Sequence, residues 1–313
     1  IAMARRLDDP HLLMWALNGR HLSLIQPLPE RMRAADELQE LALRTQSPGF
    51  ELLAHMMHTH NRLELFDLPG ADEAAARCDA LLERLPLPWP RFQHTVWRAN
   101  RLVLDGRFDD AEALYREAEK QAERIGVWHV RSVVDVGRLA MCYQRGTMAE
   151  AGPLIDAVAG THATVEHDSR VLHLCAQGRV EEAWETVGDG WPAPPPDWTW
   201  LAAICLQGTA QATVGYEPGC RATYAVLLPH SGRIAAVPAI CCSGPVDWYL
   251  ALLASAVGDH DAAYRHLTLL EWLAERNGLT WWHERARAAA QRLSERLVNA
   301  PARYDGVDAL YGL

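Results

Sequence analysis

The chain has 313 residues, of which 49% are hydrophobic and 22% are charged, a composition typical of a globular protein with a continuous core. Forty acidic residues outnumber 30 basic ones, and the resulting net charge of −10 disfavours direct binding to nucleic acid, because phosphates are repelled. The longest apolar run, Tyr249 to Val257, is far shorter than the ~20 residues of a membrane-spanning helix, so we expect no membrane contact.

The first residues and the cysteines bear on the cellular compartment. The chain begins Ile-Ala-Met-Ala-Arg-Arg, which carries no signal peptide and does not resemble a natural start, so we expect a fragment of a longer protein. Seven cysteines without a Cys-x2-Cys motif indicate free thiols rather than a disulfide framework. Both features favour a reducing cytoplasm.

The N-terminal part of the sequence reads as helices. Residues Met32 to Arg44 place Leu38, Leu41 and Ala42 on one helical face. A second helix is predicted from Ala71 to Leu85, where the Pro-rich turn at residues 86–90 ends it.

A short pattern then recurs along the chain: Gly, mostly polar or small residues, then Ala in a helical stretch. Strong copies begin at Gly106, Gly146, Gly178 and Gly258 and reach Ala111, Ala151, Ala183 and Ala263; weaker copies begin at Gly70 and Gly215. The glycines lie 32 to 43 residues apart, which is a period near 37, and no strand-like alternation separates them. Each Gly is expected to end one helix in the left-handed conformation, and each Ala to let two helices approach closely. The pattern predicts an all-α solenoid of stacked helix hairpins.

The Pro-rich segment at residues 188–197 is the one compositional break. It could be a hinge between two halves or a long loop between helices, and we favour the loop because the repeat period continues across it. The expected organisation is therefore N-terminal repeats at 1–187, this loop, and C-terminal repeats with a cap at 198–313, in one continuous solenoid. The last helix is predicted from Thr280 to Val298, and residues 305–313 are expected to form a capping tail.

The repeat order of Gly, Ala, an aromatic residue and Ala resembles tetratricopeptide repeats, which implies a right-handed solenoid. Several segments resemble the helical-repeat region of large actinobacterial signalling and transcriptional regulators: residues 224–233, 244–250, 252–254 and 258–263, together with Arg6 to Pro10 and Leu104 to Glu112. Those proteins join a STAND-type ATPase, the solenoid and an output module of the LuxR or antibiotic-regulator type. The resemblance implies a sensor or inhibitory arm. This chain lacks a phosphate-binding loop and a basic recognition helix, so the resemblance confers neither ATPase nor DNA-binding activity.

The resemblance to tetratricopeptide repeats also places a concave groove on the first helix of each pair. Its expected lining is acidic and polar at one end and apolar in the middle, which suits a basic peptide, an amphipathic helix or a mid-sized apolar ligand. The candidate groove residues are His60, Glu64, Gln93, Asn100, Tyr143, Asp168 and Trp248.

Signals for chemistry are weak. His55 and His58 stand at i, i+3, as metal ligands can, but no third ligand lies at a matching turn, so we predict no metal. No motif indicates a cofactor, a catalytic serine or a dinucleotide site.

Two hypotheses follow, and we favour the first. The first is a non-enzymatic protein- or ligand-binding module that serves as the regulatory arm of a cytoplasmic regulator. The alternative is a solenoid whose pocket carries enzymatic activity, using tryptophans and His60 with Glu64 or Asp67.

Overall fold

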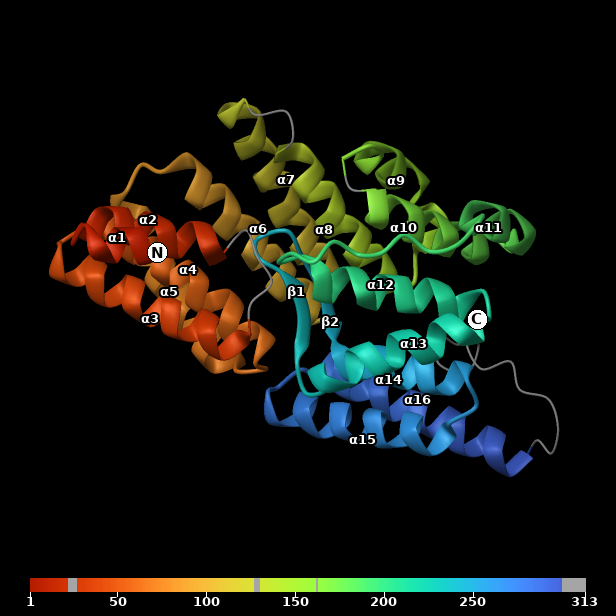
Figure 1. The fold of residues 1–313 in the computed structure, drawn as a ribbon. Coiled ribbons are helices and arrows are strands. Elements are labelled where there is room, and N and C mark those ends of the chain that lie inside the picture. The colour runs from red at the N-terminus through yellow and green to blue at the C-terminus, as the bar shows by residue number, and fades with distance from the viewer. Residues whose placement is uncertain (22–26, 127–129, 162, 300–313) are drawn as a thin grey trace.

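The computed structural model describes residues 1–21, 27–126, 130–161 and 163–299, and in these residues helices dominate around one two-stranded sheet (Figure 1). The predicted all-α class is confirmed in this coarse sense, while the handedness of the solenoid stays a prediction. The α-helices are α1 (Ala2–Arg6), α2 (Pro10–His21), α3 (Leu28–Arg44), α4 (Pro48–Glu64), α5 (Leu68–Arg84), α6 (Pro88–Leu104), α7 (Phe108–Ile125), α8 (Val130–Arg145), α9 (Gly152–Val158), α10 (Ala163–Ala176), α11 (Val180–Val187), α12 (Trp200–Thr213), α13 (Glu217–Leu227), α14 (Val246–Ala256), α15 (His260–Arg276) and α16 (Thr280–Asn299). Short 3-10 turns cover Met148–Glu150 and Leu228–His230.

The repeat glycines end helices as expected. Gly106, Gly146, Gly178 and Gly258 have φ between 74° and 80°, the left-handed region that a residue with a Cβ rarely adopts. The weak copy at Gly70 was wrong, because Gly70 lies within the first turn of α5 and donates its N–H to the Asp67 side chain. At that repeat Phe66, with φ 64°, takes the left-handed position instead.

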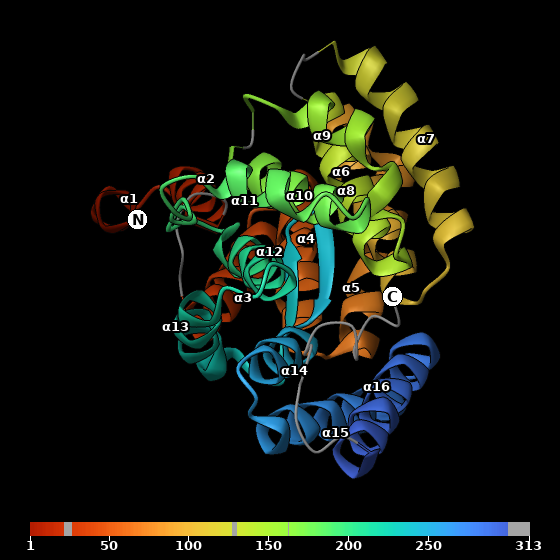
Figure 2. The same ribbon diagram turned by 90° about the vertical axis from the view of Figure 1, so that its right-hand side faces the viewer.

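The repeat alanines lie where neighbouring helices meet. Ala111, Ala151, Ala183 and Ala263 are each 0% exposed, which confirms the predicted close helix packing. Consecutive helices pack on one another along the chain, and the even-numbered helices from α4 to α14 form the inner side of the curved array (Figure 2).

The expectation that no strands interrupt the repeats was wrong. Strands β1 (Ile234–Val237) and β2 (Cys241–Pro245) form an antiparallel hairpin, in which Ile234 pairs with Pro245 and Val237 with Cys241. A register shift lies between Ala235 and Ala236. The hairpin lies against α4, α6, α8, α12 and α14, so it occupies the concave side of the helical array (Figures 1 and 2).

A tryptophan cluster joins the C-terminal helices to the hairpin and to the middle of the chain. Trp248 and Trp282, both fully buried, meet edge to face at 5.8 Å, and the guanidinium of Arg285 lies 4.4 Å from the Trp248 ring centre. Trp281 packs edge-on against Phe108 at the start of α7, at 5.4 Å. Tryptophan here fills space between distant repeats. The predicted stripe of α16 is buried at Trp282, Ala286, Ala289 and Leu293. The predicted capping tail at 305–313 lies outside the described residues.

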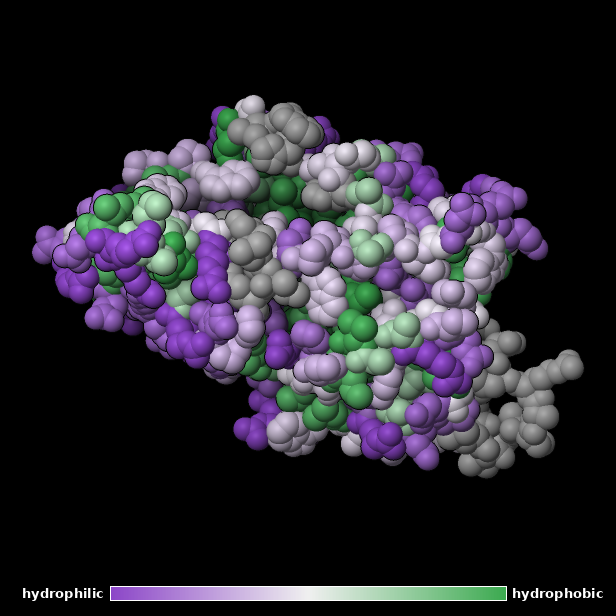
Figure 3. Space-filling view, in the orientation of Figure 1, coloured by the Kyte–Doolittle hydropathy of each residue, from purple (hydrophilic) through white to green (hydrophobic). Residues whose placement is uncertain are grey.

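The surface shown in Figure 3 is largely hydrophilic, with an apolar patch over α1 and α2. Its members are exposed apolar side chains in or directly after the first two helices, Met3, Leu7, Leu12 and Trp15. Trp15 is partly covered by Phe50 of α4, whose ring lies 5.1 Å away.

Candidate functional site

The hairpin is fastened to the inner helices by polar contacts at both ends. At its tip, the N–H of Ala239 donates to Nε2 of His60 on α4, at 3.0 Å. Farther along, Nε2 of Gln144 on α8 donates to the carbonyl of Cys242, at 2.6 Å. At its base, Arg233 forms an ion pair with Glu64 at 3.3 Å, and Glu64 also pairs with Arg31 of α3. The concave side is thus filled by a segment of the same chain.

The candidate groove residues do lie on inner helices, but the structure buries most of them. An open groove was expected; in the structure His60, Glu64, Asn100, Tyr143, Asp168 and Trp248 are all buried, and Gln93 is half-buried. The physical reason is the hairpin together with the packing of adjacent repeats. Sequence reasoning missed this occupant because the segment carries no alternation of polar and apolar residues.

Asn100 and Asp168 are engaged in side-chain hydrogen bonds. The hydroxyl of Tyr115 on α7 donates to Oδ1 of Asn100, at 2.6 Å. Nδ1 of His167 lies 2.8 Å from Oδ1 of Asp168. Burial raises the pKa of the Asp168 carboxyl, and the hydrogen bond from His167 opposes that shift. The first contact joins α7 to α6, whereas the second lies within α10.

The residues of the enzymatic alternative do not converge on an open space. Nε2 of His60 already accepts the Ala239 N–H, and burial, with His21 and Arg31 nearby, holds the pKa of His60 well below its usual value. Both oxygens of Glu64 face arginines, and Asp67 caps α5 and pairs with Arg62. His60, Glu64 and Asp67 each form contacts within the fold.

A cavity of about 490 Å³ remains on the concave side beside the hairpin, within the ~300–1,000 Å³ typical of small-molecule sites. Its walls come mainly from α8, α10, α12, the hairpin and residues 188–199, and α14 contributes Tyr249. Its aromatic members are Tyr143, Trp198 and Tyr249, and the Tyr143 and Tyr249 rings are stacked with centres 6.0 Å apart. The remaining wall is mostly aliphatic, and hydroxyl groups are contributed by Thr161, Thr164, Ser169, Thr199 and Ser243.

Residues 188–199, here named the strap, form the wall that sequence reasoning treated only as a loop. The strap connects α11 to α12 and crosses the helical array in extended form (Figure 1). Gln207 of α12 donates to the carbonyl of Pro192 at 2.6 Å, and the Trp191 ring lies 5.4 Å from that of His167. Ala193, Pro195, Asp197 and Trp198 of the strap face the cavity. Four prolines within a stretch that also holds tryptophans are the signal that could have suggested a stiff wall.

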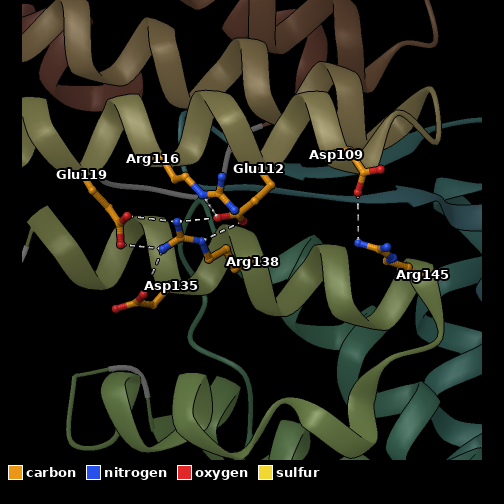
Figure 4. Close-up of polar contacts among 7 residues, drawn as sticks. All are labelled: Asp109, Glu112, Arg116, Glu119, Asp135, Arg138 and Arg145. Atoms are coloured by element: carbon orange, nitrogen blue, oxygen red, sulfur yellow. Dashed lines mark hydrogen bonds and ion pairs between the residues drawn. The ribbon is translucent and has the colours of Figure 1, made fainter.

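A second hollow, of about 440 Å³, lies between α7, α8 and α9, and its lining mixes charged side chains with apolar ones of α9. Arg138 is its centre: it donates to both Glu112 and Glu119 and lies 3.9 Å from Asp135 (Figure 4). Burial would lower the pKa of Arg138, but the hydrogen bonds to the two glutamates raise it overall. Since the charges around Arg138 compensate one another, we interpret this network as a tie between α7 and α8.

The cysteines and histidines show no assembled reactive centre. All seven cysteines are free, and burial raises the pKa of Cys241, which faces the cavity, to about 12, so its thiol is a poor nucleophile. Among the described residues, no group of three or more His, Cys, Asp or Glu side chains is arranged to hold a metal ion. His55 and His58 have ring centres 6.5 Å apart.

Comparison of the chain with protein-family models, curated proteins and solved structures finds no match. None of the described helices combines the length and apolarity that crossing a bilayer requires.

Proposed function

We propose that this chain is a non-enzymatic, ligand-binding helical-repeat arm of a regulatory protein, and that its ligand is a mid-sized apolar molecule held in the cavity beside the hairpin. The observation that carries the proposal is the cavity itself: about 490 Å³, walled by Tyr143, Trp198, Tyr249 and aliphatic side chains of five elements. Apolar walls with a few hydroxyl groups are the usual make-up of a small-molecule site.

The hairpin favours this ligand over a peptide. A bound helix or extended peptide would need the concave side that β1 and β2 fill, with His60 and Glu64 already bonded to hairpin residues. A small molecule needs no such displacement. His60, Glu64 and Asp67 are each bonded to other residues of the fold, which supports binding rather than catalysis as the role of this chain. The regulatory role rests on the resemblance to the solenoid arms of STAND-type regulators.

A fluorescence titration with the uncharged probe N-phenyl-1-naphthylamine tests the proposal. We expect saturable binding to the wild-type chain, with at least about tenfold weaker binding in Ala140→Phe, since the added ring fills the space beside the half-buried Ala140 of α8. Thr164→Phe, on the part of the wall that α10 contributes, is a second variant should the first fold poorly. Ala80→Phe, on the exposed face of α5, is the size-matched control.

Binding that is equal in all four proteins, with unchanged melting temperatures, would place the probe elsewhere and overturn the proposal. Absence of saturable binding to the wild-type chain would do the same.

A further inference from the structure

The charge on the cavity wall is unevenly distributed. Among the described wall residues Asp197 of the strap is the one with a formally charged side chain, and none is Lys or Arg. Asp168 lies on α10 one residue before the wall residue Ser169 and is not itself part of the wall. Asp168 is buried, its Oδ1 meets His167, and its Oδ2 has no hydrogen-bond partner. Asp197 is therefore the charged group on the described cavity wall, and Asp168 lies behind that wall.

Asp197 is also held in place. Its Oδ1 accepts the Thr199 backbone N–H at 2.8 Å and the Thr199 hydroxyl at 2.6 Å, directly before α12 begins. These bonds fix the carboxylate on the wall, beside Trp198. A positioned carboxylate next to aromatic rings is the environment that binds an organic ammonium group, through an ion pair and through attraction to the ring faces.

We propose that the ligand of this cavity is an amphiphilic organic cation, an apolar body carrying a protonated amine, and that Asp197 is the residue that selects its charge. This inference rests on the proposed function, because it concerns the same cavity. The apolar body is held by the aliphatic and aromatic walls, and the amine lies at the strap, where Asp197 neutralises it. An anion of the same shape is rejected by the same carboxylate.

Three probes with one ring system separate charge from shape: 1-naphthylmethylamine (a cation at neutral pH), 1-naphthylmethanol (uncharged) and 1-naphthoate (an anion). Each competes with N-phenyl-1-naphthylamine, and the displacement gives its affinity. For the wild-type chain we expect the order amine, alcohol, carboxylate, with the amine roughly three- to tenfold tighter than the alcohol, as for a partly screened ion pair.

The matched variant is Asp197→Asn, because the amide oxygen can still accept from Thr199 while the charge is removed. In this variant the affinity for the amine should fall to nearly that for the alcohol, while the affinity for the alcohol stays unchanged. Asp189→Asn, in the same strap but exposed and outside the cavity wall, should keep the wild-type ratio. Should Asp197→Asn fold poorly, the wild-type chain provides a second measurement: the ratio must fall as salt rises.

Two results would overturn the charge selection while leaving the proposed function standing: an alcohol that binds as tightly as the amine in the wild-type chain, or an amine-to-alcohol ratio that survives Asp197→Asn. In both, probe binding would still be weakened by Ala140→Phe. Probe binding that ignores Ala140→Phe would instead remove the site and, with it, both proposals.

Discussion

Ala239, at the tip of the hairpin, is held in a conformation that suits glycine. Its φ is 51°, and its N–H donates to His60. A non-Gly residue in the left-handed region costs about 1–2 kcal/mol, and part of this is recovered by the lower entropy of its unfolded chain. We therefore expect Ala239→Gly to raise the free energy of unfolding in urea by about 0.5–1 kcal/mol.

The control for this prediction is Ala76→Gly, on the exposed face of α5, where glycine should cost about 1 kcal/mol. A loss of stability in Ala239→Gly comparable to that in Ala76→Gly would contradict the prediction.

Buried histidines make the fold sensitive to mild acid. His21 is 3% exposed, and burial, followed by Arg31 and His58, lowers its pKa to about 3. Below pH 6.5 the unfolded chain binds a proton at His21 and the folded chain does not, so stability falls as pH falls. The slope is about 1.4 kcal/mol per pH unit for each such histidine. His60, whose pKa is also lowered by burial, adds to it.

Urea unfolding between pH 7.5 and 5 measures this slope, which should be shallower in His21→Leu than in the wild-type chain. His11→Leu, at an exposed position of α2, is the control. A slope that His21→Leu leaves unaltered would show that this residue does not carry the effect.

At the scale of elements, the hairpin depends on one glycine in β2. Gly244 has φ 101°, and a Cβ built there would lie 2.3 Å from Cζ2 of Trp282. Since Trp282 is fully buried, it cannot move aside freely. We expect Gly244→Ala to lower the free energy of unfolding by about 1–3 kcal/mol from overpacking, in addition to backbone strain.

Gly232→Ala is the matched control, because Gly232 has φ 79° but nothing within 4 Å of a Cβ. The free energy of unfolding of Gly232→Ala should fall only by the cost of the left-handed backbone conformation. Equal losses in the two variants, measured by urea unfolding, would mean that the contact with Trp282 has no part in the effect.

The helices were predictable from sequence and the hairpin was not, for one physical reason. Ala111 and Ala263 each sit at a fixed distance after a glycine, so local pattern alone marks helix ends and contact faces. Residues of β1 and β2 are buried on both faces, and such a strand has no alternation to read. The walls of the candidate site likewise fall into a part that the sequence predicts and a part that it does not. The inner faces of α8 and α10 follow from the repeat register, whereas the strap and hairpin walls depend on contacts between residues far apart in sequence.

At the scale of the whole molecule, the contacts that cross the concave side set this protein apart from a simple solenoid, in which each repeat touches only its neighbours. His60 bonds Ala239, Glu64 pairs with Arg233, and Arg285 donates to the carbonyl of Gln144. The N-terminal and C-terminal helices are thereby coupled through the hairpin.

We therefore expect one cooperative unfolding transition. Far-ultraviolet circular dichroism, which follows all helices, and tryptophan fluorescence should give coincident urea curves. Glu64→Gln, which removes one of these long-range contacts, should separate the two curves, whereas Arg221→Gln, which removes an exposed pair within α13, should not. Curves that already differ in the wild-type chain would contradict the expectation.

The hairpin also has a consequence for biosynthesis. A ribosome produces α4, α6, α8 and α12 before it reaches residues 234–245. The inner faces of these helices therefore leave the ribosome before the hairpin that will cover them. During that interval the nascent chain presents a curved apolar trough, a natural substrate for chaperones. Translation that pauses or stops before β2 would leave this trough open.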